Sequence, residues 1–277
     1  MDQAIALTNY LNAIILGMVE GVTEFLPISS TGHLIIAGNL LDFTGPRANT
    51  FEIFIQLGAI LSVLWHYRAR LRVIPDAING DGQAIGFILN LAVAFLPAAF
   101  FGFLFHSAIK KYLFSPITVA IALIVGGIII LWVEQNEREA RVAEVDNMDW
   151  RDSLKVGFAQ CLALFPGTSR SGATIIGGML FGLSRRAATE FSFFLAIPTM
   201  FAATLYDLYK SRGDLTSSDI PLFAVGFVIS FFSALVVVRA LLVYISKHNF
   251  SVFAWYRIVF GGLVLLYAWN FPGAFAD

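Results

Sequence analysis

The sequence contains few charged residues. Only 13% of its 277 residues are Asp, Glu, Lys or Arg, whereas soluble domains carry about 25%. Instead, 58% of the residues are hydrophobic, and the mean hydropathy is +0.76. This composition excludes an ordinary water-soluble globular fold and predicts an integral membrane protein.

Cysteine and an excess of charge of one sign are also lacking. The net charge of −1 provides no basic surface, so we expect no nucleic-acid partner. Cys161 is the only cysteine, which excludes a disulfide within the chain. Met1-Asp2-Gln3 lacks the basic residues that open a cleaved signal peptide. We therefore expect the chain to enter the membrane through its own spans.

Long apolar runs are what the sequence has in place of charge. A bilayer about 30 Å thick is crossed by a helix of roughly 20 residues. Six runs approach or exceed this length, and we predict that each is a transmembrane helix. They cover residues 50–67, 84–105, 115–133, 187–209, 220–245 and 252–271.

Two polar stretches, residues 20–33 and 160–174, lie between apolar runs that are too short to span a bilayer. Each stretch contains a break of Pro, Ser and Gly. Non-helical backbone at membrane depth is tolerated only where it is buried in protein or lines a wet cavity. We therefore predict two re-entrant helical hairpins with tips near the midplane, whose limbs are residues 13–26, 34–41, 154–165 and 173–183.

The two polar stretches resemble each other when one is shifted by 140 positions. The shift aligns Gly17 with Gly157, Phe25 with Phe165, Ser29 with Ser169, Gly32 with Gly172, and Gly38 with Gly178. This similarity predicts an internal repeat, with halves 1–135 and 151–277 and a polar linker at 136–150. Three spans follow each hairpin. Because three is an odd number, the second half enters from the opposite face, and the halves should have inverted topology. The expected fold is a single all-α membrane domain in which both tips meet.

Lysine and arginine are distributed unevenly between the two sides of this predicted topology. One side carries ten basic residues and the other carries five, which places the first side in the cytoplasm. Both termini and the mouth of the first hairpin then face outward. The ten are Arg68, Arg70, Arg72, Arg138, Arg141, Arg151, Lys155, Arg185, Arg186 and Lys247.

The first polar stretch contains two acids, three hydroxyl residues and a histidine. Glu20 and Glu24 are four positions apart, so they share one helical face. Close carboxylates in a low dielectric require a shared proton, a cationic partner or a metal such as Mg²⁺ or Ca²⁺. Ser29, Ser30 and Thr31 precede a helix, where a hydroxyl is usually an N-cap. His33 is either structural or a base for the Ser30 hydroxyl.

The second polar stretch combines hydroxyl groups with one guanidinium at the start of a helix. A helix N-terminus binds anions through its free N–H groups, and Arg170 adds a planar fork suited to phosphate. Alternatively, Arg170 only neutralises the two acids. A cation is needed between carboxylates and phosphate, so the set suits metal-assisted attack on phosphorus. The midplane location implies a substrate with a lipid tail.

These motifs resemble those of a known family. Glu20-x-x-x-Glu24 followed by Ser-Ser-Thr-Gly-His, with Pro166-Gly-Thr-Ser-Arg-Ser-x-x-Thr in the second half, is similar to the undecaprenyl-pyrophosphate phosphatases of the bacitracin-resistance type. The resemblance covers essentially the whole chain, including residues 51–59. It implies removal of one phosphate from the C55 pyrophosphate carrier lipid, recycling of that lipid for peptidoglycan, and bacitracin resistance. It also implies a divalent cation and a bacterial inner-membrane enzyme open to the periplasm.

The resemblance also implies roles for individual residues. Glu20 and Glu24 would be the paired acids and metal ligands, and Ser30 the nucleophile. His33 would be its base, with a phosphohistidine route left open. Arg170 would bind phosphate with the help of Ser169, Ser171, Thr174, Thr31 and Gly167. Gln56 and Glu190 are polar residues within spans that would support the tips, whereas Gln160, the repeat mate of Glu20, is not expected to be catalytic.

Two further functions fit parts of the sequence. Inverted repeats with broken helices are typical of transporters, so a flippase of the polyprenyl phosphate is the alternative, either alone or beside hydrolysis. A second lipid-phosphatase family places a histidine soon after a Ser-Arg pair, but no histidine follows Arg170 before His248. A homodimer is compatible with the sequence.

Overall fold

The computed structural model describes residues 2–112, 115–136, 139–211 and 219–270. Within these ranges the regular structure is helical, apart from one isolated bridge between Val142 and Leu183. Short 3-10 turns, η1 to η3, occupy Arg68–Arg72, Val145–Asn147 and Cys161–Leu164. The helices are α1 (Asp2–Thr23), α2 (Ser30–Leu40), α3 (Pro46–His66), α4 (Val73–Ile78), α5 (Gly82–Tyr112), α6 (Pro116–Gln135), α7 (Trp150–Gln160), α8 (Arg170–Leu180), α9 (Arg185–Ser211), α10 (Ile220–Ile245) and α11 (Ser251–Asn270).

Six of these helices are long and apolar enough to cross a membrane, namely α3, α5, α6, α9, α10 and α11. They match the six predicted spans to within a few residues, which confirms an all-α, multi-pass membrane protein. Local sequence explains several of their starting points. Pro46, Pro116 and Pro221 lie in the first turns of α3, α6 and α10, where the missing N–H of proline costs nothing. Ser115 caps α6 by accepting a hydrogen bond from the backbone N–H of Thr118 at 3.1 Å.

The first hairpin has one limb longer than the sequence indicated. Most of the apolar run at 13–26 is the second part of α1, which ends at Thr23, has 22 residues and is about 33 Å long at 1.5 Å per residue. The other three limbs, α2, α7 and α8, have 11 residues each and are short, as predicted. The sequence did not indicate the part of α1 before residue 13, because polar residues there interrupt the apolar pattern without breaking the helix.

The two hairpins have the same local structure at positions 140 residues apart. Helices α2 and α8 both have 11 residues, and their N-caps are Ser29 and Ser169. The φ angles of these two serines are 71° and 74°, in a region of backbone conformation that residues other than glycine rarely adopt. Each serine hydroxyl accepts a hydrogen bond from the N–H three residues later, that of Gly32 or Gly172. This correspondence supports the predicted repeat.

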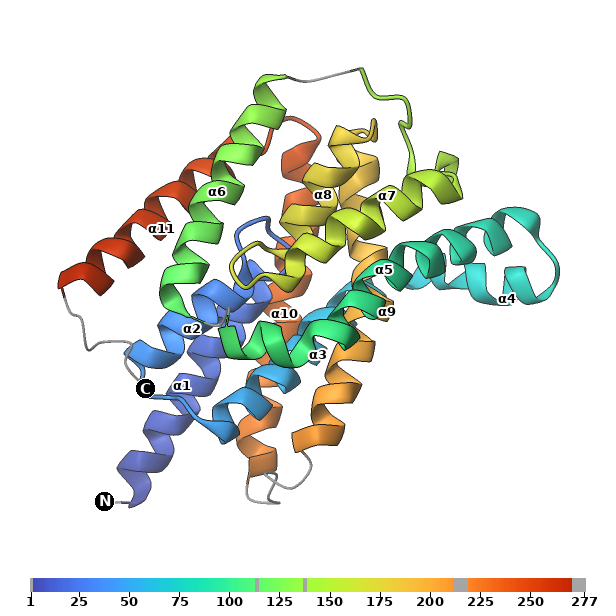
Figure 1. The fold of residues 1–277 in the computed structure, drawn as a ribbon. Helices are drawn as coiled ribbons and strands as arrows, with labels where there is room; N and C mark the ends of the chain where they lie inside the picture. The colour runs from blue at the N-terminus through green and yellow to red at the C-terminus, as the bar shows by residue number, and fades with distance from the viewer. Residues whose placement is uncertain (1, 113–114, 137–138, 212–218, 271–277) are drawn as a thin grey trace.

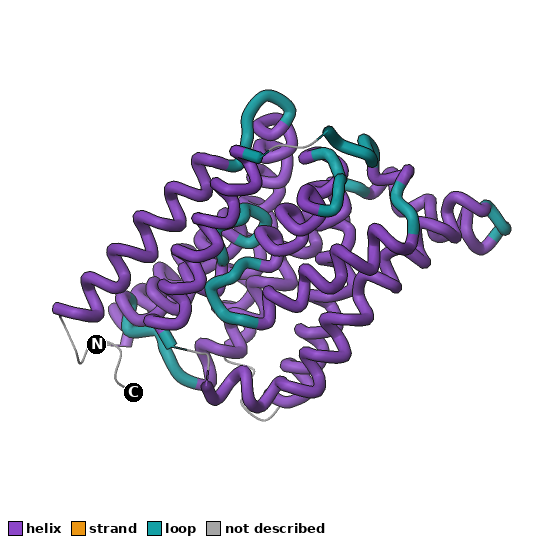
Figure 2. Tube along the Cα trace, turned by 45° about the horizontal axis from the view of Figure 1, so that its top comes forward, coloured by secondary structure: helices purple, strands orange, loops and turns teal. Residues whose placement is uncertain are grey.

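Each hairpin packs against a helix of the other half. Helix α1 lies along α10, and α7 lies along α5. At both interfaces a glycine permits close approach. A Cβ atom on Gly17 would lie 2.5 Å from the carbonyl oxygen of Gly226, and one on Gly157 would lie 2.5 Å from that of Ala94. Because each hairpin packs on the opposite half, the two hairpin loops meet in the middle of the bundle (Figure 1). They are the two central loops in Figure 2.

Ion pairs join the connecting segments at the ends of the bundle. Three arginines on the side predicted to be cytoplasmic bind acids there, and Arg47 on the opposite side binds Asp219 at 2.6 Å. The polar linker is thereby attached to α7 and to the turn after α3, while the start of α9 is attached to the end of α6. The three pairs are Arg70 with Asp146, Arg141 with Asp152, and Arg185 with Glu134.

Candidate active site

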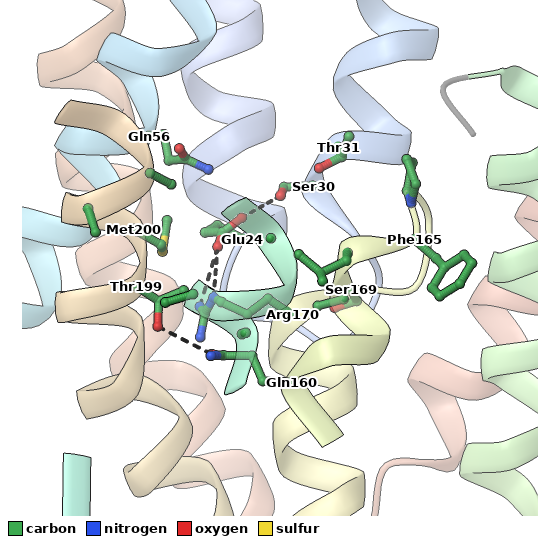
Figure 3. Close-up of a pocket in the computed structure, with 18 of the residues that line it drawn as sticks. Glu24, Ser30, Thr31, Gln56, Gln160, Phe165, Ser169, Arg170, Thr199 and Met200 are labelled. Atoms are coloured by element: carbon green, nitrogen blue, oxygen red, sulfur yellow. Dashed lines mark hydrogen bonds and ion pairs between the residues drawn. The ribbon is translucent and has the colours of Figure 1, made fainter. Parts of the chain in front are cut away.

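A cavity of about 470 Å³ lies beside the two meeting loops. Its polar wall includes Glu24, Ser30, Ser169 and Arg170, several of which are visible in Figure 3. Its remaining walls are mainly apolar and come from α5 and α9. They include Phe95, Ala98, Ala99, Gly102, Phe103, Met200, Ala202 and Ala203. The site therefore combines a small polar pocket with an apolar corridor.

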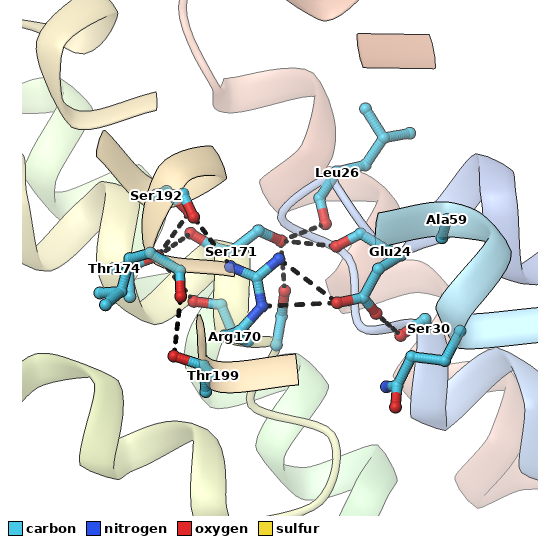
Figure 4. Close-up of polar contacts among 12 residues, drawn as sticks. Glu24, Leu26, Ser30, Ala59, Arg170, Ser171, Thr174, Ser192 and Thr199 are labelled. Carbon is cyan, nitrogen blue, oxygen red and sulfur yellow. Dashed lines mark hydrogen bonds and ion pairs between the residues drawn. The ribbon is translucent and has the colours of Figure 1, made fainter. Parts of the chain in front are cut away.

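Glu24 connects the two hairpins. It follows α1 directly, and its backbone N–H donates to the carbonyl oxygen of Glu20 at 2.9 Å, so it continues the helical path. Its buried carboxylate accepts hydrogen bonds from Arg170 Nη2 at 3.3 Å and Nε at 3.4 Å. The Ser30 hydroxyl donates to the other carboxylate oxygen. Figure 4 shows Glu24 between Arg170 and Ser30. The structure thus brings together three residues predicted to act at the site.

Arg170 is held in place without using all of its hydrogen-bond donors. It is the first residue of α8, and its Nη1 also donates to the carbonyl oxygen of Ser192 on α9 at 3.0 Å. These three bonds leave two of the five N–H donors of the guanidinium without a partner among the described residues. The side chain is 11% exposed and lines the cavity. Arg170 can therefore pair with Glu24 and still contact an anion.

Two helix N-termini face the same cavity. Ser30 and Thr31 begin α2, and Ser169 and Arg170 stand at the start of α8, all on the cavity wall. N–H groups in the first turn of a helix have no intrahelical partner, and the helix dipole is positive there. Gly167 has a φ of 90°, and a Cβ there would lie 2.5 Å from the Val119 carbonyl oxygen, so the loop requires glycine. The arrangement favours an anion with several oxygens.

Ser171 and Thr174, which the resemblance places around the phosphate, are turned into the protein. Neither lines the cavity, and both are fully buried. The Ser171 hydroxyl donates to the Leu26 carbonyl oxygen at 2.8 Å, and the Thr174 hydroxyl lies 2.7 Å from the Ser192 hydroxyl. Ser171 thus joins the second hairpin to the first, while Thr174 joins α8 to α9. In this arrangement they support the second hairpin without reaching the cavity.

Glu20 lies one helical turn before Glu24 and is only 1% exposed. It does not line the cavity, and among the described residues its Oε1 atom has no hydrogen-bond partner. No group of three His, Cys, Asp or Glu side chains in the described chain is arranged to hold a metal ion. Of the two predicted ligands, only Glu24 lines the cavity, so a divalent cation there would be held by Glu24 together with phosphate oxygens and water, a ligand set that Mg²⁺ commonly uses. The assignment of Glu20 as a second ligand stays a prediction.

His33 points away from the Ser30 hydroxyl. Its Nδ1 lies 2.7 Å from the Ser29 carbonyl oxygen, and its Nε2 lies 2.6 Å from the Tyr256 hydroxyl on α11. The imidazole also stacks on Phe260, with ring centroids 4.5 Å apart, and it does not line the cavity. The geometry thus places Glu24, rather than His33, in contact with the proposed nucleophile.

Several polar residues at the site were not predicted to act there, or were given only a supporting role, in the sequence analysis. Gln56, Gln160 and Thr199 line the cavity, and Arg257 contacts both hairpin loops from behind. Each is a polar residue within a predicted span or hairpin limb. Such residues are costly at membrane depth and usually functional. The position of an arginine within a predicted span could therefore have pointed to Arg257.

Comparison with known proteins agrees with these observations. Residues 13–263 match the family model described as bacitracin resistance protein BacA. The chain is 62% identical over 261 residues to undecaprenyl-diphosphatase 2 of Rhodospirillum rubrum, covering 94% of this chain and 95% of the relative. It is 61% identical over 260 residues to undecaprenyl-diphosphatase of Nitrosospira multiformis, with the same two coverages. The chain therefore belongs to the family of the bacitracin resistance protein BacA.

Proposed function

We propose that this protein is a membrane phosphatase that hydrolyses undecaprenyl diphosphate to undecaprenyl phosphate and inorganic phosphate. The observation that carries the proposal is the contact of Glu24 with both Ser30 and Arg170 at one end of an apolar corridor. The relatives that are about 60% identical over most of the chain are named undecaprenyl-diphosphatases. The product would be recycled as a carrier lipid for peptidoglycan and other envelope polymers, and bacitracin would lose its lipid target.

The walls of the cavity suit the two parts of such a substrate. Arg170 and the first turns of α2 and α8 supply donors for the oxygens of a diphosphate. Apolar side chains of α5 and α9 line the rest of the cavity, where the first isoprene units of the tail would lie. Gly102 and Ala203 are part of this wall, and their small size leaves room for a chain.

Ser30 and Glu24 supply the chemistry in this proposal. The Ser30 oxygen attacks the terminal phosphorus while Glu24 takes the hydroxyl proton, and the bond between phosphorus and the bridging oxygen breaks. Undecaprenyl phosphate then leaves as a weakly basic anion that needs no proton. Glu24 releases this proton to solvent and is ionised again. A water molecule then attacks the phosphoserine while Glu24 takes one of its protons, the bond between phosphorus and the Ser30 oxygen breaks, and Glu24 passes the proton to that oxygen as phosphate is released. Arg170 stabilises the charge on the transferred phosphoryl group.

A divalent cation, Mg²⁺ or Ca²⁺, is part of the proposal, with Glu24 as its protein ligand. The ion would neutralise charge on the diphosphate, which lets a carboxylate and an anionic substrate share the site. Glu20 would act one turn behind, through its effect on Glu24.

We also propose that the protein lies in the bacterial inner membrane with the cavity open to the periplasm. The cavity extends to Tyr206 and Asp207, near the end of α9 that carries Lys210. That end belongs to the side with fewer basic residues, which the distribution of charge places outside. A homodimer stays a prediction that a mass measurement in detergent would test.

The test is phosphate release from undecaprenyl diphosphate by the purified protein in detergent. We expect Ser30→Ala and Arg170→Ala to abolish most of the activity, and Glu24→Gln to lower kcat by about 10²–10⁴. EDTA should inhibit, and Mg²⁺ or Ca²⁺ should restore the rate. Ser246→Ala, which changes a residue outside the cavity, is the matched control. Full activity in all three site variants would reject the assignment.

A further inference from the structure

Arg257 is a cation buried in the protein interior without an acidic partner. It lies on α11, is 1% exposed, and is the largest of the fully buried side chains in the described chain. None of the ion pairs found among the described residues includes it. A charge in this position is costly unless its surroundings are arranged for it. The mechanism proposed above gives it no role.

All five N–H groups of its guanidinium are matched by backbone carbonyl oxygens. Nη1 donates to Pro27 and Thr168, each at 3.0 Å, so it contacts both hairpin loops. Nη2 donates to Gly167 and Nε donates to Leu123 of α6, at 3.1 and 3.2 Å. The remaining bond from Nη2 reaches the Ala122 carbonyl oxygen at 3.1 Å.

The guanidinium contacts equivalent positions in the two loops. Pro27 and Gly167 are 140 residues apart, and each lies two residues before the serine that caps the following helix. One side chain therefore joins the corresponding carbonyl groups of both halves and holds them against α6. The helices that begin after these serines carry Ser30 and Arg170 to the cavity.

The surrounding backbone leaves room for this side chain. A Cβ on Gly126 of α6 would lie 2.2 Å from Arg257 Nη2 and 2.7 Å from its Cζ. A Cβ on Gly172 of α8 would lie 3.1 Å from Nη1. A glycine at position 126 is thus required for the guanidinium to lie where it does.

We propose that Arg257 is a positioning residue that fixes the two loops relative to each other, and thereby sets the placement of Ser30 against Arg170. This inference rests on the proposed function. Lysine cannot replace the arginine. Its ammonium group is a compact charge with three donors, so it cannot bind the five carbonyl oxygens that the planar guanidinium contacts. The role depends on geometry as well as on charge.

The first experiment compares Arg257→Lys with Arg185→Lys in the phosphatase assay. Arg185 is also a partly buried arginine, but it binds Glu134 away from the cavity. Misplacement of reacting groups by about 1 Å can cost about 10² in rate. We therefore expect Arg257→Lys to lower kcat by about 10- to 100-fold with a smaller change in KM. Arg185→Lys should lower the melting temperature and leave kcat near the wild-type value.

A second pair of variants displaces Arg257 without removing its charge. Gly126→Ala inserts a methyl group against the guanidinium, whereas Gly262→Ala on α11 has open space around its Cβ. We expect Gly126→Ala to lower kcat as Arg257→Lys does, and Gly262→Ala to have no effect. This pair decides the question if Arg257→Lys does not fold.

The outcomes separate this inference from the proposed function. A wild-type protein that releases no phosphate would reject the proposed function. An active wild type, with kcat unchanged in folded Arg257→Lys and Gly126→Ala, would overturn the positioning role alone. An equal loss of kcat in Arg185→Lys would also overturn it, because the effect would then follow general destabilisation.

Discussion

Individual side chains at the site form bonds across the two halves of the protein. Glu24 from the first half binds Arg170 from the second, and both are nearly buried. Removing one partner of such a pair leaves an unpaired buried charge, which typically costs about 3–5 kcal/mol. Substitution of either residue would therefore reduce both stability and activity, so activity has to be compared between folded variants.

His33 differs from Glu24 in that its ring nitrogens are engaged away from the cavity. One nitrogen lies at the Ser29 carbonyl oxygen and the other at the Tyr256 hydroxyl. Through these contacts His33 fixes the start of α2 to α11. This geometry favours a structural role, although the assignment of His33 as the base of Ser30 stays a prediction of the sequence.

Tyr256→Phe distinguishes the two roles of His33. The variant loses the phenolic partner of Nε2 but keeps the ring that stacks near the imidazole. If His33 is structural, we expect kcat to fall less than about 10-fold and its pH profile to keep its shape. Glu24→Gln should lose about 10²–10⁴, the usual contribution of a general base. Loss of activity in a folded Tyr256→Phe protein would return the role of base to His33.

Among the helices, close backbone contacts help to hold each hairpin against the opposite half. Each hairpin has at least one limb of only 11 residues, which is too short to cross a bilayer. Small residues permit such contacts, and helix association in membranes depends on close packing. Gly17 and Gly157 occupy equivalent positions in α1 and α7, each against a carbonyl oxygen of the opposite half.

Gly157→Ala tests this packing. The new Cβ would meet the backbone of Ala94 at 2.5 Å, so α7 must move away from α5. We expect a loss of about 1–3 kcal/mol in the free energy of unfolding, as for overpacked cores. Gly86→Ala in α5 is the matched control, because its Cβ meets nothing within 4 Å. There, alanine should be neutral or stabilising by up to about 1 kcal/mol. Equal stability in thermal melts of both variants would contradict the packing argument.

For the whole molecule, the important feature is the apolar corridor that continues the cavity beyond the polar pocket. Its walls come from α5 of the first half and α9 of the second, and its inner end is formed by both loops. In the proposed function, the substrate head and tail would be recognised by different parts of the fold. A change in the corridor should affect long lipid tails more than short ones.

Ala203→Trp tests the role of the corridor. The indole would fill space on the α9 wall of the cavity, where the proposed tail lies. We expect KM for the C55 diphosphate to rise about tenfold or more, and KM for a C15 diphosphate to rise less, since losing contact with even two buried CH₂ groups costs about 1.6 kcal/mol. Ala240→Trp, on the exposed side of α10, is the control. An equal rise in KM for both substrates would argue against a tail site here.

Much of the architecture could be predicted because it depends on local chemistry. The six spans follow from apolar length, and the breaks follow from Pro, Ser and Gly at fixed positions. The identities at a spacing of 140 residues pointed to two equivalent hairpins, and both have the same serine cap. The length of α1 was missed because helix propensity continues through polar residues that hydropathy counts against a span.

The sequence by itself determined that this chain crosses a membrane six times and carries acids, hydroxyls and an arginine at two helix breaks. These properties depend on residues close together in the chain. Only the tertiary structure decided that Glu24 contacts Arg170, that Ser171 and Thr174 face the protein, and that Arg257 holds both loops. The contacts of Glu24 with Arg170, and of Arg257 with Pro27 and Thr168, join residues 89 to 230 positions apart. Such distant pairings are fixed by packing, which no local pattern specifies.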